Sequence, residues 1–274
     1  VRVYYLFIAL LYFGKGAYVT GYVPFLQSIG FSLAEVSLLN LCYWVLVAAL
    51  ELPTGLLADG RGRAWSVKMG TAATALGVVI YSQASGFASA LSGEVFWAIG
   101  TAFLSGAMQA WITDAVEPGK NTRKIFATGK VVYYVVYLVA SIIGAVVAAR
   151  SFQWMWAQTV LFMAAAFLVA HHYMTGRGDP PARVTERVAL RAGIQALRST
   201  RALQWLATAM LIFGVTALTN HFWSPYFKAF VGQARLGLVW AIMPIFGLLG
   251  ATLVARSRAA VGNEWHLITL SLCL

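Results

Sequence analysis

The stretch LELPTGLLADGRGRAWSVKMG, from Leu50 to Gly70, is the most unusual segment of this 274-residue chain. It lies between two long apolar runs, yet it contains two of the nine acidic residues of the chain, three basic residues and several glycines. The charged residues and the glycines before Gly70 are Glu51, Gly55, Asp59, Gly60, Arg61, Gly62, Arg63 and Lys68. Because unpaired charge is costly inside a bilayer, this concentration predicts a functional turn at a membrane boundary.

The composition around this turn is that of a membrane protein. Hydrophobic residues make up 60% of the chain and charged residues only 11%, whereas soluble domains carry about 25% charge. Continuous apolar runs recur at the length of about 20 residues that a spanning helix needs, which favours helices over a β-barrel. The predicted spans are 3–26, 33–57, 66–85, 90–115, 125–149, 153–174, 202–227 and 236–255, and a ninth run starts near Trp265.

The net charge of +11 is explained by membrane topology. With a cytoplasmic N-terminus, sixteen of the 20 Lys and Arg residues fall on the inner side, Arg150, Lys228 and Arg235 fall outside, and Lys15 lies within a span. This is the bias of the positive-inside rule. The basic charge therefore predicts no nucleic-acid partner, and the protein is expected in a bacterial inner (plasma) membrane.

The polar segment from His171 to Arg201 divides the chain. The predicted organisation is an N-terminal six-helix bundle over 1–174, a basic cytoplasmic linker over 175–201, and the start of a C-terminal bundle over 202–274. An apolar stripe on the basic linker fits an amphipathic helix at the anionic inner leaflet, although a merely solvated linker helix fits it equally well.

Two sequence matches predict an internal repeat. YVPFLQSIGFS around Pro24 resembles WSPYFKAFVGQA around Pro225, 201 residues later, and the arginine pairs that begin at Arg61 and Arg256 are 195 residues apart. Two matches at nearly the same offset indicate duplication of a six-helix unit, as in transporters built from parallel repeats. A six-helix unit used twice has twelve spans, so about four further spans are expected beyond this chain, which begins without Met and ends in an apolar run.

The residues of this turn resemble a known sequence signature. Gly55-Leu-Leu-Ala-Asp59-Gly-Arg61-Gly62-Arg63 resembles the loop 2–3 signature of the major facilitator superfamily, roughly G-x-x-x-D-R-x-G-R-R, in the matching place between spans 2 and 3. The resemblance implies an all-α membrane fold of two six-helix repeats, the second incomplete here. It also implies a conformational latch between helix bundles. The family's basic residues are replaced by Gly and Ala at positions 60 and 64.

The latch prediction has a physical basis and a partner implied by the family. Gly55 would allow close helix contact, and glycines 60 and 62 a turn with positive φ. Asp59 would need a cation or the amides at the start of the next helix. In the family an acid at the end of span 4 pairs with the turn arginine, which implies a pair between Asp114 and Arg63. The predicted latch is Gly55, Asp59, Arg61, Gly62, Arg63 and Asp114; a simple positive-inside turn is the alternative.

Other polar residues are candidates for substrate binding or ion coupling. Lys15 lies about 18 Å into span 1 at 1.5 Å per residue, flanked by glycines, and is expected to face the central cavity or to pair structurally with an acid. Glu94 opens span 4 and either has a functional role or faces the outer water layer. Span 7 contains an amide, an imidazole and two aromatic side chains. They could bind a planar solute, or the aromatics could belong to an interface belt. The candidates are Lys15, Glu51, Glu94, Asn220, His221, Trp223 and Tyr226.

The favoured function is secondary active export of a drug-like or metabolite small-molecule solute, coupled to protons or another ion. The chain has no glycine-rich phosphate loop for ATP-driven pumping, and the adjacent histidines 171 and 172 point about 100° apart, which is poor geometry for one metal ion. We therefore expect no catalytic residue, metal or cofactor. The alternatives are a sugar or organic-anion symporter or facilitator and, in another class, an intramembrane lipid-processing enzyme.

Overall fold

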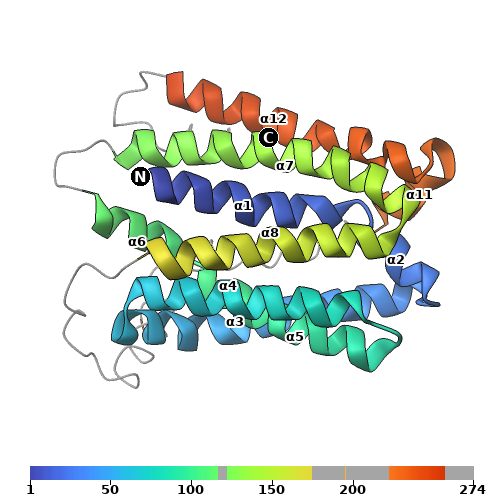
Figure 1. Cartoon of the computed structure of the whole chain (residues 1–274), viewed down its shortest axis with the longest axis horizontal. Helices are drawn as coiled ribbons and strands as arrows, with labels where there is room; N and C mark the ends of the chain where they lie inside the picture. The colour runs from blue at the N-terminus through green and yellow to red at the C-terminus, as the bar shows by residue number, and fades with distance from the viewer. Residues whose placement is uncertain (117–121, 175–194, 196–221, 257–274) are drawn as a thin grey trace. The chain divides into compact units, whose positions relative to one another are not determined.

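The computed structural model describes residues 1–116, 122–174, 195 and 222–256 (Figure 1). All regular elements in these ranges are helical, which confirms the all-α prediction. The elements are α1 (Arg2–Val19), α2 (Tyr22–Ser28), α3 (Leu33–Arg61), α4 (Arg63–Ser82), α5 (Phe87–Leu104), α6 (Ala107–Ala115), α7 (Thr122–Arg150), α8 (Phe152–Tyr173), α11 (Trp223–Val231), η1 (Gln233–Arg235) and α12 (Leu236–Arg256).

Most of the predicted spans correspond to helices that could cross a membrane. Within the described ranges four helices are long and apolar enough, and six are if each of two bent pairs counts as one span. The predicted span 66–85 forms α4. This helix is not among those apolar enough to cross a membrane, because small and polar residues make up much of it. Most of the predicted span 202–227, and the linker 175–201 except Gln195, lie outside the described residues.

Two predicted spans are broken helices. The span 3–26 consists of α1 and α2, bent by 45°, and the span 90–115 consists of α5 and α6. The second break occurs at Gly106, whose φ of +73° favours glycine. A Cβ at Gly106 would meet no described atom within 4 Å, so this glycine makes the break and does not serve a close helix contact among the described residues.

The chain forms two compact units that are each discontinuous in sequence. Unit 1 comprises Val1–Tyr22, Ala115–Val169 and Phe227–Leu274. Within it α7 packs against α1, η1 and α12. Glycines permit these contacts: a Cβ at Gly144 of α7 would overlap the carbonyl group of Ala17 in α1.

Unit 2 comprises Val23–Asp114 and Ala170–Tyr226, and its described core is built from α3, α4 and α5. Glycines of α4 and α5 face one another. A Cβ at Gly100 would lie 2.6 Å from the backbone N of Thr74 and 2.7 Å from the carbonyl O of Gly70. This is the small-residue packing by which membrane helices associate.

The two segments paired by the predicted repeat share a local structure. Each is a short helix, α2 or α11, with proline in its first turn, and each is followed by a glycine with positive φ: Gly30 at +95° and Gly232 at +75°. A long helix follows in both cases, α3 or α12. The similarity agrees with the duplication inferred from the sequence.

Candidate functional site

The turn between α3 and α4 is shorter than the sequence predicted. Gly60 lies inside α3, so the expected positive φ at this residue is wrong, and Gly62 alone makes the turn, with φ +98°. Arg61 ends α3, where a cation is favoured by the helix dipole, and its guanidinium lies 4.9 Å from the ring centroid of Trp65. Because α3 runs to Arg61, Arg63 becomes the first residue of α4.

Arg63 forms the ion pair that the resemblance implied. Its Nη1 lies 2.6 Å from Oδ2 of Asp114 and also donates to the carbonyl O of Ala110 at 3.3 Å. The pair therefore connects the start of α4 to the end of α6. Both side chains are partly exposed, 34% and 47%, and such pairs contribute only about 0–1 kcal/mol. A weak pair suits a contact that opens and closes; the latch role itself stays a prediction.

Two other predicted latch residues are not engaged in the described part of the chain. Asp59 is exposed and has neither a hydrogen bond nor an ion pair with a described residue, so the expected partner is not found there. A Cβ at Gly55 would meet no described atom within 4 Å. The close approach expected at Gly55 is therefore absent among the described residues.

Glu51 lies on α3 beside the break between α5 and α6. Its Oε1 accepts a hydrogen bond of 3.1 Å from the Ser105 hydroxyl, while its side chain stays exposed. One turn later Thr54 donates to the carbonyl O of Ala102 at 3.0 Å. These contacts hold α3 against the end of α5, which is a structural role for Glu51.

Glu94 is buried, with 4% exposure, in the third turn of α5. The alternative that it faces an outer water layer is therefore wrong. Its carboxyl group interacts electrostatically with Tyr43 of α3, whose hydroxyl donates to Oγ1 of Thr101 at 2.9 Å. A buried acid in a spanning helix is a functional candidate by default.

Lys15 lies near the middle of the broken span formed by α1 and α2 and is partly buried. The flanking glycines make close contacts: a Cβ at Gly14 would lie 2.8 Å from Cε of Met163, and one at Gly16 would lie 3.0 Å from the carbonyl O of Tyr137. Lys15 is therefore positioned where α1 meets α7 and α8.

A tyrosine cluster, defined as Tyr12, Tyr133, Tyr134 and Tyr137, accompanies Lys15. The Lys15 Nζ lies 5.7 Å from the ring centroid of Tyr12, and the Tyr12 and Tyr133 centroids are 4.4 Å apart. Tyr134 and Tyr137 have centroids 4.7 Å and 5.4 Å from that of Tyr133. This cluster was not predicted from the sequence, although the spacing of tyrosines in KVVYYVVY was a signal for it.

The described part of unit 1 contains no Asp or Glu at all. Lys15 therefore has no carboxylate partner among those residues, and a structural ion pair within them does not account for it. A cation beside several phenol groups in an apolar helical unit can bind an anionic or hydrogen-bond-accepting group.

The candidates in span 7 are only partly described. Asn220 and His221 lie outside the described residues. Trp223 is partly buried at the start of α11, and Tyr226 is 62% exposed. An exposed Tyr agrees with the interface-belt interpretation of this residue.

Comparisons with known proteins agree with these features. A family model described as "Major Facilitator Superfamily" matches residues 4–272. The fold is similar to the crystal structure of the nucleoside transporter NupG, with TM-score 0.69 and 12% identity over 93% of this chain and 66% of that chain. It is also similar to a D-xylose-proton symporter, with TM-score 0.59 and 15% identity over 92% of this chain and 67% of that chain.

The chain spans about two thirds of the length of these two structures. At 12% and 15% identity the likeness concerns the fold alone. A search of curated proteins gave no match.

Proposed function

The chain belongs to the major facilitator superfamily, and on that premise we propose that the protein is a secondary active transporter that moves a small solute across a membrane by alternating access. The match over residues 4–272 confirms the resemblance first found in the α3–α4 turn. Membership also contradicts the alternative of an intramembrane lipid-processing enzyme.

The position of Lys15 is the observation that carries the substrate proposal. It is a partly buried cation near the middle of a broken span, beside the tyrosine cluster, in a unit without a described acid. Such a charge is expensive to keep in a membrane unless it has a function. We infer a drug-like or metabolite solute that combines an anionic group for Lys15 with a planar apolar part for the tyrosine rings.

Ion coupling is proposed for Glu94. Its carboxyl group is buried and lies near Tyr43, so loss or gain of a proton there changes the charge inside unit 2. A group whose charge changes during the cycle can bias the equilibrium between two conformations. The proposed coupling ion is the proton, and the proposed direction is export.

The Arg63–Asp114 pair is proposed as the latch. It is short but partly exposed, so breaking it costs little and the pair can reform in each cycle. The pair lies where α3 and α6 end and α4 begins, so movement of these helix ends would affect it.

Transport in vesicles tests the proposal. Naphthalene-2-sulfonate serves as the probe, because it is planar and permanently negative, and N-methylquinolinium serves as the cationic control. In everted membrane vesicles with an acidic interior, the protein should accumulate the labelled sulfonate, and Lys15→Met should not. Accumulation only in right-side-out vesicles under an outside-acid gradient would instead assign import, as for a symporter. Preference for the cation would contradict the role of Lys15.

A further inference from the structure

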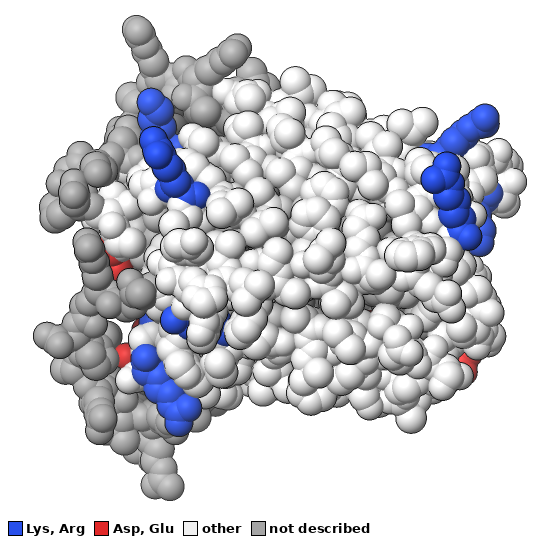
Figure 2. Space-filling model, viewed as in Figure 1, with Lys and Arg blue, Asp and Glu red and all other residues white. Residues whose placement is uncertain are grey.

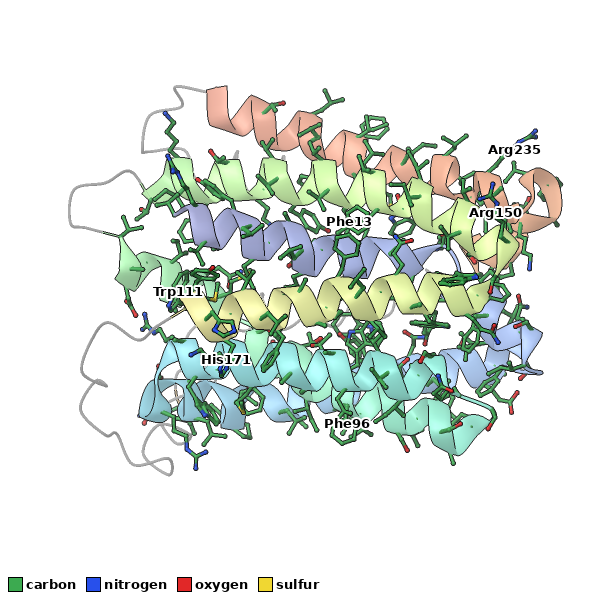
Figure 3. The ribbon with its side chains drawn as sticks, in the orientation of Figure 1. Phe13, Phe96, Trp111, Arg150, His171 and Arg235 are labelled. Carbon is green, nitrogen blue, oxygen red and sulfur yellow. The ribbon has the colours of Figure 1, made fainter. Side chains whose placement is uncertain are left out.

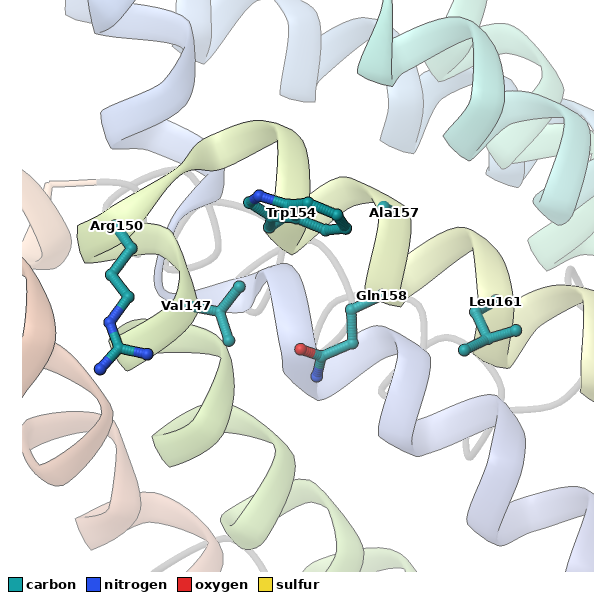
Figure 4. A pocket seen from close by; sticks show the side chains of 6 residues that line it. All are labelled: Val147, Arg150, Trp154, Ala157, Gln158 and Leu161. Carbon is teal, nitrogen blue, oxygen red and sulfur yellow. The ribbon is translucent and has the colours of Figure 1, made fainter.

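A groove lies between α7 and α8 on the surface of unit 1 (Figure 4). Its volume of about 520 Å³ falls within the range of about 300–1,000 Å³ that is usual for ligand sites. Neither the α3–α4 turn nor the Lys15 site contributes to it. The lining residues are Val147 and Arg150 of α7 and Trp154, Ala157, Gln158 and Leu161 of α8.

The chemistry of the groove changes in one direction, from the turn between α7 and α8 inward. Arg150 stands at the turn. Three groove residues follow along α8, at about 1.5 Å per residue from Phe152: Trp154 at about 3 Å, Gln158 at about 9 Å and Leu161 at about 14 Å. Trp154 and Leu161 are 71% and 65% exposed. The order is therefore cation, amphipathic aromatic, amide and aliphatic.

The charged end of the groove is strongly cationic. Arg150 is exposed on α7, and Arg235 is exposed on η1, which packs against α7. Figure 3 shows both at the same end of unit 1, and Figure 2 shows blue side chains gathered there. Lys228 adds a third positive charge seven residues before Arg235. With no acid in the described part of unit 1, nothing there offsets this charge.

Gln158 supplies the second polar feature. Its Nε2 is buried and has no hydrogen-bond partner among the described residues. A buried amide without a partner costs about 1–3 kcal/mol, so such groups usually meet an acceptor. At about 9 Å below the turn, the acceptor would lie between a charged headgroup and an apolar chain.

We propose that this groove binds one anionic phospholipid from the leaflet that borders the α7–α8 turn. The phosphate contacts Arg150, with Arg235 and Lys228 completing the positive field. An ester carbonyl accepts from the Gln158 amide, and one acyl chain follows Ala157 and Leu161. Charge, amide and apolar surface thus occur in the order in which a phospholipid presents phosphate, ester and hydrocarbon.

The site has a consequence for topology. Arg150, Lys228 and Arg235 are the three basic residues that the predicted orientation places on the outer side, against the usual bias. Three exceptions in one unit, of which Arg150 lines the groove, are explained if they attract an anionic headgroup there.

Native mass spectrometry of the purified protein tests the proposal. Dioleoylphosphatidylglycerol is the probe, and dioleoylphosphatidylcholine, which is zwitterionic with no net charge, is the comparison with the same chains. One phosphatidylglycerol should stay bound preferentially. Arg150→Gln should weaken it about fivefold, since one basic residue near a membrane surface contributes about 1 kcal/mol. Lys124→Gln, at the opposite end of α7, is the matched control and should change nothing.

A second pair of variants tests the apolar part. Leu161→Trp should fill the groove and reduce lipid retention, whereas Leu168→Trp, on an exposed position of the same helix, should not. Equal retention of the two lipids, or unchanged binding in both Arg150→Gln and Leu161→Trp, would overturn the proposal. Equal competition by glycerol 3-phosphate, which has no acyl chain, would show an anion site instead and would also overturn it.

Discussion

Replacing Gly100 with Ala should separate α4 from α5. The added Cβ would lie 2.6 Å from the backbone N of Thr74 and 2.7 Å from the carbonyl O of Gly70, and it would overlap the Thr74 hydroxyl. These distances are 0.7–0.8 Å short of the 3.4 Å at which ordinary contact begins. Backbone atoms of a helix cannot rotate away, so the two helices must move apart.

The expected cost follows from this overlap. Overpacking of a well-packed core costs about 1–3 kcal/mol. Alanine also favours the helix by about 1 kcal/mol relative to glycine, which would mask part of the loss in a single measurement. Gly60→Ala is therefore the control, because Gly60 is also helical but its added Cβ would meet no described atom within 4 Å.

Thermal unfolding of the two purified variants in the same detergent measures the difference. At about 2–4 °C per kcal/mol for a chain of this size, a cost of about 1–3 kcal/mol means that Gly100→Ala should unfold roughly 2–12 °C below Gly60→Ala. Equal unfolding temperatures would show that α4 and α5 are not in the close glycine contact described for unit 2.

The remaining predictions concern transport. Arg63→Ala and Asp114→Ala should each impair solute flux. Each should lower the free energy of unfolding by at most about 1 kcal/mol, because the pair is partly exposed. Normal flux in both variants would contradict the latch role. Lys15→Met should abolish binding of naphthalene-2-sulfonate, measured by equilibrium dialysis, whereas wild-type affinity and pH dependence would end its proposed role. Glu94→Gln should make solute accumulation in vesicles independent of an imposed pH gradient, and a gradient response like that of the wild type would assign coupling elsewhere.

The helices could be predicted from the sequence because each depends on a local property. A run of about 20 apolar residues can cross the membrane only as a helix, so α7 and α8 begin and end within three residues of their predicted limits. The breaks were not predictable in this way. Gly60 stands between charged residues and Gly106 stands in an apolar run, yet Gly106 interrupts a span while Gly60 continues α3. Packing decides between these outcomes.

Part of the candidate site could likewise be predicted from the sequence, and part could not. The Arg63–Asp114 pair was predicted because a family pattern supplied the long-range partner. No such pattern was used for the tyrosine cluster, whose members lie on α1 and α7, more than one hundred residues apart. The buried position of Glu94 depends on how α5 packs against α3 and α4, and local hydropathy does not encode it.

The discontinuity of unit 1 also sets an order of events during synthesis. α1 packs against α7, and at about 5–20 residues per second the roughly 100 residues between them take on the order of 5–20 s to translate. During that interval α3, α4 and α5 emerge consecutively and can pack together. Until α7 emerges, α1 lies in the bilayer with the charged Lys15, which is not yet accompanied by the tyrosines of α7. Newly made chains are therefore most vulnerable to membrane quality control between the emergence of α1 and that of α7.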